Sequence, residues 1–155
     1  TKTDYFRGKT NMTSIKEYRA QFWTSDGLYN SVIEKSGLSS SEFMTLYCIS
    51  NGINTQSAIS KKLYMPKQTI NSAVKKFEKQ GVIRLVGTLG NDKLKTLALT
   101  AKGEELVKDK VLAMDKVEEA VWAELDENEK EQLVRLTARF NELLGEKVTS
   151  FLKEE

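Results

Sequence analysis

The pattern of residues 55–99 constrains the fold of this 155-residue chain more than any other feature. Apolar residues first recur at helical spacing on both sides of Pro66, the only proline, and the pattern then changes to two short strand-like runs around a glycine-containing turn. Few architectures accommodate two short helices, a tight joint and a hairpin in that order. We therefore expect a helix-turn-helix followed directly by a β-hairpin.

The ends of the two short helices are marked by their residue types. Thr55 is the expected N-cap of a helix over residues 56–63, and Pro66 is expected in the first turn of the next helix, where its missing N–H costs nothing. Gly81 is expected to end that second helix. The spacing of its apolar residues predicts a buried face made of Ile70, Val74 and Phe77.

The hairpin follows at once. Residues 82–86 and 94–99 are rich in Val, Leu and Ile, which is typical of strands. Residues 87–93 lie between them and contain Gly, Asn and Asp, which favour turns.

Longer helices are predicted before this segment. One is expected from about residue 13 to residue 35, with a weak point at Asp26-Gly27, where a glycine lowers helix propensity. Gly37 is expected to end it. Ser39 opens a second helix, because Glu42 stands three residues later and completes a capping box.

Two further helices are predicted after the hairpin. The first is expected from Thr100, as N-cap, to about Glu124, and the second opens at Asp126 with Glu129 as its capping partner. The predicted fold class is therefore mostly α-helical with one small β-hairpin.

Charge is distributed unevenly along the chain. Residues 61–95 carry nine Lys and Arg against two Asp and Glu, a net of +7, whereas residues 1–60 have a net charge of +1 and residues 96–155 of −6. Clustered basic residues on one element are the electrostatic footprint of nucleic-acid binding. The segment that contains the predicted helix-turn-helix is therefore also the one suited to a polyanion.

The second helix of the pair carries the candidate DNA-binding residues. An α-helix fits the major groove, where polar side chains near its N-terminus reach base edges and lysines contact phosphates. The hairpin tip adds Lys93, which is expected to reach a phosphate or the minor groove. The predicted DNA-binding residues are Lys67, Gln68, Thr69, Asn71, Ser72, Lys75, Lys76 and Lys93. Lys79 follows them on the same helix and is expected near phosphates.

Residues 39–103 resemble the DNA-binding domain of the MarR (multiple antibiotic resistance regulator) family. Residues 56–63 are similar to the first helix of the family's motif, residues 68–83 to its recognition helix and the turn that follows, and residues 97–103 to the segment after its wing. The resemblance implies a winged helix-turn-helix between long dimerisation helices. It also implies a homodimer that binds a pseudo-palindromic site on double-stranded DNA.

Two departures from the family pattern bear on the DNA sequence that is recognised. The family's wing usually carries Asp-x-Arg, whereas the matching positions here are Asn91-Asp92-Lys93, so a lysine replaces the arginine. Ser72 stands where many members have an arginine. Because lysine lacks the flat guanidinium fork, weaker readout of the minor groove is expected. The departures leave the target sequence open, but not DNA binding itself.

A homodimer is also expected from the residues themselves. The first and the last two helices are long, and their apolar stripes exceed what one small motif needs to cover. We therefore expect residues 1–36 and 101–155 to form dimerisation helices around a DNA-binding lobe at residues 37–100, all within one continuous domain.

The aromatic residues of the first two helices have two interpretations. Their helical spacing favours core packing. The resemblance instead implies a pocket for a small aromatic effector, lined by Tyr18, Phe22 and Tyr47. Cys48 lies in an apolar stretch and is interpreted as a small buried hydrophobe rather than a redox sensor.

The sequence favours a dimeric, sequence-specific transcriptional regulator, expected to be a ligand-responsive repressor. A winged-helix module that binds protein rather than DNA is the alternative. The chain has no His, one Cys and no glycine-rich phosphate loop. We therefore do not expect an enzyme, and we expect no metal site and no cofactor. No apolar run approaches the roughly 18–20 residues that span a bilayer, and no signal peptide is recognised, so a cytoplasmic protein is expected.

Overall fold

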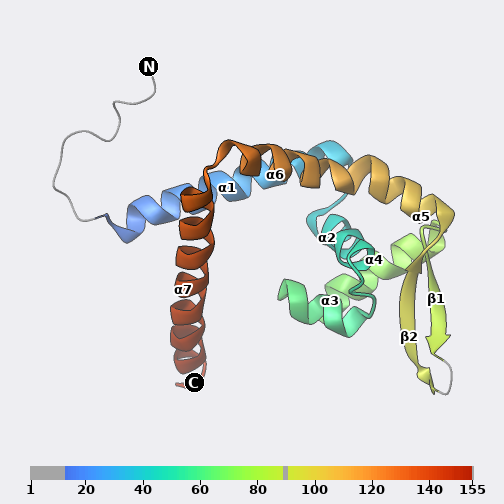
Figure 1. Cartoon of the computed structure of the whole chain (residues 1–155). Coiled ribbons are helices and arrows are strands. Elements are labelled where there is room, and N and C mark those ends of the chain that lie inside the picture. The colour runs from blue at the N-terminus through green and yellow to red at the C-terminus, as the bar shows by residue number, and fades with distance from the viewer. Residues whose placement is uncertain (1–12, 89–90, 155) are drawn as a thin grey trace. The chain divides into compact units, whose positions relative to one another are not determined.

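A computed structural model describes residues 13–88 and 91–154 of the chain, without the side chains of Thr88 and of residues 91–94 (Figure 1). The chain divides into two compact units, with the boundary between Val111 and Leu112. The first unit holds the predicted helix-turn-helix and hairpin, and the second holds two helices.

The first unit contains five α-helices, one antiparallel hairpin and a π-helical segment among the residues described. In chain order these are α1 (Ile15–Ser36), α2 (Ser40–Ser50), α3 (Gln56–Leu63), α4 (Lys67–Lys79), β1 (Ile83–Thr88), β2 (Asn91–Leu99), α5 (Ala101–Leu106) and the π-helical segment Val107–Val111. The predicted fold class, a mostly α-helical winged helix-turn-helix, is confirmed.

Helix starts in this unit follow local capping chemistry. The Ser39–Glu42 capping box before α2 and the Thr55 cap before α3 form as predicted. A further capping box, Ser14 with Glu17, starts α1. Pro66 lies one position earlier than predicted, at the N-cap of α4, because its ψ of 141° is extended rather than helical. Helix α1 continues through Gly27, since one interior glycine weakens a helix without ending it.

One apolar core holds together the DNA-binding lobe, and the π-helical segment Val107–Val111 packs into the same core, so that from here on the lobe means residues 37–111. The core is formed by α2, α3 and α4, by the base of the hairpin and by the π-helical segment. Its fully or almost fully buried members include Phe43, Leu46, Ile49, Ile59, Ile70, Val74, Phe77, Val82, Ile83, Leu97, Val107 and Val111. Because each such side chain contributes about 1.5–3 kcal/mol by burial, this core fixes α4 on its neighbours.

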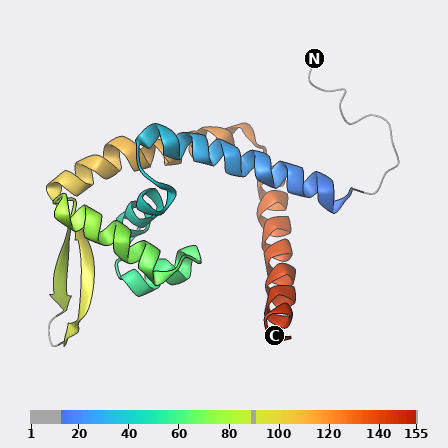
Figure 2. The same ribbon diagram turned by 180° about the vertical axis from the view of Figure 1, so that it is seen from behind.

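The hairpin projects from this core, as the views from opposite sides show (Figures 1 and 2). Its strands pair from Ile83 with Leu99 to Val86 with Thr96, and the register becomes irregular at Gly87. Strand β2 begins at Asn91, three residues earlier than the sequence indicated, because pairing extends further toward the tip.

Hydrogen bonds fix the base of the hairpin to the helices. The Leu97 N–H donates to the Asn54 carbonyl at 2.7 Å, and the Thr100 hydroxyl donates to the Gly81 carbonyl at 2.6 Å. At the start of α5, a Cβ on Gly103 would lie 2.1 Å from the Val82 carbonyl oxygen, so only glycine permits this approach. The base of the wing is therefore held through Leu97 of β2 and through Gly81, Val82 and Thr100, which flank the two strands.

The helix predicted from Thr100 to Glu124 is not uniform. Its first part is α5, its middle is the π-helical segment, and its last part is α6 (Leu112–Glu124), which belongs to the second unit. π-helical turns inside α-helices often occur at functional sites. No residue pattern in this stretch distinguishes it from an ordinary amphipathic helix.

The second unit consists of α6 and α7 (Glu127–Phe151), and α7 starts at the predicted Asp126–Glu129 capping box. Met114 is buried, whereas α7 buries none of its residues. Most of the apolar stripe predicted for the last helix is exposed, namely Leu133, Leu136, Leu143, Leu144, Val148, Phe151 and Leu152. No helix among the described residues is long and apolar enough to cross a membrane.

Candidate nucleic-acid interface

Helix α4 turns a polar face away from the lobe. Its buried residues are Ile70, Ala73, Val74 and Phe77, which recur at helical spacing and define the face toward the core. Among the predicted DNA-binding residues of α4, Lys67, Gln68, Ser72, Lys75 and Lys76 are exposed, and Thr69 and Asn71 are half-buried. The core therefore leaves most of the predicted reading residues accessible.

Four exposed residues form the ridge opposite that core. At 100° per residue, Gln68, Ser72, Lys75 and Lys79 fall on one line along the helix, at i, i+4, i+7 and i+11. The Ser72 hydroxyl donates to the backbone carbonyl of Gln68 at 2.9 Å, so this hydrogen bond does not involve the side-chain amide of Gln68. We call this line the α4 ridge.

Lys76 is engaged elsewhere, which the sequence did not indicate. Its Nζ donates to Glu42 Oε1 of α2 at 2.7 Å, and the Glu42 side chain is only 13 % exposed. Glu42 is also the capping residue of α2. The ion pair thus joins α4 to α2, and contact of Lys76 with DNA stays a prediction.

The turn between α3 and α4 is closed by short hydrogen bonds. The Ser60 hydroxyl donates to the Met65 carbonyl at 2.6 Å, and the Met65 N–H donates to the Ser60 carbonyl at 3.1 Å. Tyr64 ends α3 in the left-handed region at φ 52°. These contacts set the position of α4 relative to α3.

The hairpin contributes further positive charge. Arg84 and Lys95 are both exposed, and the strand register places them on opposite faces of the hairpin. The backbone of Lys93 lies in β2, but its side chain falls outside the described residues. The predicted role of Lys93 in the wing therefore stays a prediction.

The proposed effector residues come from two helices. Tyr18 and Phe22 on α1 are 43 % and 57 % exposed, and Tyr47 on α2 is half-buried. The pocket lined by these three residues stays a prediction.

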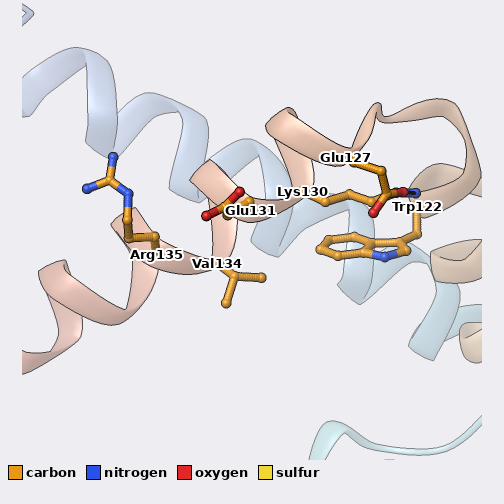
Figure 3. Close-up of a pocket in the computed structure, with 6 residues that line it drawn as sticks. All are labelled: Trp122, Glu127, Lys130, Glu131, Val134 and Arg135. Atoms are coloured by element: carbon orange, nitrogen blue, oxygen red, sulfur yellow. Dashed lines mark hydrogen bonds and ion pairs between the residues drawn. The ribbon is translucent and has the colours of Figure 1, made fainter.

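A shallow depression lies within the second unit (Figure 3). It has a volume of about 580 Å³, and Lys130 and Glu127 in its wall form an ion pair at 2.7 Å. Figure 3 shows the Lys130 side chain next to the Trp122 ring. Its lining residues are Trp122, Glu127, Lys130, Glu131, Val134 and Arg135. No motif in the sequence had indicated it.

Cys48 is buried in α2, as the sequence analysis predicted. Burial raises the pKa of the Cys48 thiol, and the positive charge of Lys62 opposes that rise to a lesser extent. A buried, protonated thiol is a poor nucleophile. Among the described residues, no group of three or more His, Cys, Asp and Glu is placed to hold a metal ion.

Two packed helices with an exposed polar ridge, followed by a basic hairpin, define a winged helix-turn-helix of the DNA-binding class. Residues 36–92 match the model of the MarR family. The resemblance expected from the sequence is thereby confirmed over these residues, and the lobe is similar to the winged helix of the MarR family.

Solved structures of MarR proteins share the fold. A MarR family regulator from Neisseria meningitidis has a TM-score of 0.76 at 18 % identity, covering 90 % of this chain and 99 % of that one. Staphylococcus aureus MarR in complex with salicylate and kanamycin has a TM-score of 0.67 at 22 % identity, covering 84 % and 92 %. The S. aureus MepR–DNA complex has a TM-score of 0.66 at 22 % identity, covering 84 % and 96 %. No curated protein sequence matches this chain significantly.

Proposed function

We propose that this protein is a dimeric, sequence-specific DNA-binding transcriptional regulator, and that it acts as a ligand-responsive repressor in the cytoplasm. The observation that carries the proposal is the α4 ridge, where Gln68, Ser72, Lys75 and Lys79 point away from the core of the lobe. Amide and hydroxyl groups of this kind bind base edges, and lysines bind phosphates.

Charge supports the same assignment. The net charge of +7 over residues 61–95 is concentrated on α3, α4 and the hairpin, whereas residues 96–155 are acidic. One solved relative is a complex with DNA. MarR family regulators are generally non-enzymatic, and we expect no catalytic activity here.

The dimer is inferred from apolar surface that a single chain does not cover. On α1, α6 and α7, large apolar side chains are exposed, among them Trp23, Trp122, Leu144 and Phe151. Exposed apolar surface on this scale marks an interface. A second copy covers these helices in the proposed dimer, so that residues 1–36 and 101–155 act as dimerisation helices and two α4 helices face two half-sites of a pseudo-palindrome.

The proposed effector is a small aromatic molecule. A solved relative holds salicylate, which is such a molecule. In this chain the proposed contacts are Tyr18, Phe22 and Tyr47. The ligand would release DNA by favouring a dimer in which the spacing of the two α4 helices no longer matches the grooves.

Fluorescence anisotropy tests the proposal. Duplex DNA from upstream of this protein's own gene is compared with a shuffled duplex, each at two salt concentrations. We expect tight, salt-sensitive binding that prefers the upstream duplex. Replacing Lys75 and Lys93 with Glu should abolish it. Replacing Lys35 and Lys153 with Glu changes the net charge by the same amount at two exposed positions away from the apolar stripes of α1 and α7, and should not.

Other outcomes overturn parts of the proposal. Equal, weak binding of both duplexes contradicts sequence specificity for that site. Binding of neither duplex at low salt contradicts DNA binding and favours the protein-interaction module.

A further inference from the structure

Tyr64 stands at a backbone position that this chain otherwise fills with glycine. Among the described residues, positive φ angles follow the ends of α1, α2, α3 and α4, and three of the four residues are Gly37, Gly52 and Gly81, with φ between 69° and 81°. The fourth, after α3, is Tyr64 at φ 52°. A bulky residue in this region is an outlier, because its Cβ crowds the backbone.

The fold gains little from the tyrosine side chain in return. Tyr64 is 97 % exposed, so its ring buries almost no area against the lobe. The hydrogen bonds that close the turn come from Ser60 and from the backbone of Met65. A glycine at position 64 would allow the same turn with less strain. The tyrosine side chain is therefore better explained by contact with a binding partner than by a role in the fold.

The surroundings of Tyr64 identify the chemistry of that partner. Residues 43–77 contain no Asp or Glu but five lysines. Two of these, Lys61 and Lys62, are exposed in the last turn of α3, next to Tyr64. An exposed phenol in a basic, acid-free stretch suits an anion, and tyrosine hydroxyls are among the groups that bind DNA phosphates.

We infer that the Tyr64 hydroxyl donates a hydrogen bond to a backbone phosphate of the DNA beside the groove that α4 enters. Tyr64 precedes Lys67, the first residue of α4, by three positions. Its ring therefore lies at the end of α4 that carries Lys67 and Gln68, and Lys61 and Lys62 supply charge to the same phosphates. This inference rests on the proposed DNA binding and extends the interface beyond the α4 ridge.

Tyr64→Phe tests the contact, because it removes the hydroxyl and leaves the ring and the backbone conformation unchanged. We expect affinity to fall about 3- to 10-fold for the upstream and the shuffled duplex alike, as for the net loss of one solvent-exposed hydrogen bond that reads no base. The dependence of log K on log salt should keep its slope, since a neutral side chain releases no counterion. Lys62→Gln should instead reduce that slope by about 0.9.

Two more variants separate binding from folding. Ser40→Ala at the start of α2 is the control, because it removes an exposed hydroxyl from a residue with no proposed DNA contact, and it should bind DNA as the wild type does. Tyr64→Gly relieves the left-handed strain, so the melting temperature should rise while DNA affinity falls at least as far as in Tyr64→Phe. Opposite signs for stability and affinity are not expected from a residue that only holds the turn.

Three results overturn the inference. Unchanged affinity of Tyr64→Phe contradicts the phosphate contact. Loss of affinity for the upstream duplex alone indicates a base contact instead. If wild-type protein binds neither duplex, the proposed function and this inference fail together, whereas binding by wild type with no effect of Tyr64→Phe overturns this inference only.

Discussion

The two compact units of this chain differ in how far their apolar residues are buried. In the lobe, Phe43, Leu46, Ile70 and Phe77 are buried within one chain. In the second unit, α7 has the same kind of amphipathic pattern, yet none of its residues is buried. An apolar stripe therefore shows that a helix has a face to cover, without showing whether the cover comes from the same chain. The lobe covers its apolar residues within one chain, whereas α7 would be covered in the proposed dimer.

The largest effect should come from placing a charge in the exposed stripe of α7. Leu144→Lys puts an ammonium group into the proposed interface between copies, where burial without a partner is costly. We expect sedimentation velocity to show a monomer where the wild type sediments as a dimer. Thr149→Lys is the control, since five residues turn it to the other side of the helix. If Leu144→Lys sediments like the wild type, α7 is not covered by a second copy through this stripe.

The next largest effect should come from overpacking the closed unit. Gly103→Ala places a Cβ against the Val82 carbonyl, where 2.1 Å is available, and should lower the free energy of unfolding by about 2–3 kcal/mol. Gly27→Ala in α1 meets no atom within 4 Å and should raise it by about 0.5–1 kcal/mol. Urea denaturation measures both. Equal effects of the two substitutions would contradict the tight approach of α5 to the lobe.

A smaller effect is expected from the one polar atom that the lobe core buries without a described partner. Thr45 is fully buried, and its hydroxyl oxygen makes no hydrogen bond among the described residues. Thr45→Val removes that group at similar volume, so the free energy of unfolding should rise by about 1 kcal/mol. Thermal denaturation measures the change. A loss of stability would show that the hydroxyl has a partner after all.

The smallest effect should be the change in the free energy of unfolding that comes from ionisation of Cys48 at high pH. Its pKa is raised above the ordinary value of 9.0 by burial, so the unfolded chain ionises first as pH rises. The resulting stability is complete below pH 9 and declines above it, by less than about 1 kcal/mol between pH 8 and 10. Urea unfolding of the wild type, compared with Cys48→Ala across that range, measures the decline.

Ellman's reagent supplies a second readout of the same difference between the units. Cys48 should react slowly in the native protein and fast in urea. In a protein that carries Cys48→Ala, the substitution Thr149→Cys on α7 should react at once. Fast native reaction of Cys48 would mean that the lobe opens easily.

The sequence predicted what depends on neighbours along the chain. The capping boxes at Ser39 and Asp126, the Thr55 cap and the end of α4 at Gly81 each need only a few consecutive residues, and all form. The buried face of α4 followed from spacing alone. For the same reason, the composition of the α4 ridge could be read from one helix.

Features that join distant residues, or that run against local residue preferences, were not predictable from the sequence. The Lys76–Glu42 ion pair links positions 34 apart, and no local pattern indicates it. The π-helical segment keeps an ordinary amphipathic sequence, and the left-handed conformation of Tyr64 contradicts residue preference. The predicted roles of Lys93, Tyr18, Phe22 and Tyr47 depend on DNA, a ligand or a second chain.

The residues that attach the hairpin to the lobe are different from the residues at the outer half of the hairpin. Its base is held by the carbonyls of Asn54, Gly81 and Val82, by the Thr100 hydroxyl and by the close approach at Gly103. All of these groups lie at the base of the hairpin, and none belongs to the residues between Val86 and Thr96. In evolutionary terms, the proposed regulator can vary the outer half of its hairpin without losing the contacts that hold the base. In that proposal, descendants of this sequence change their operators while the lobe stays the same.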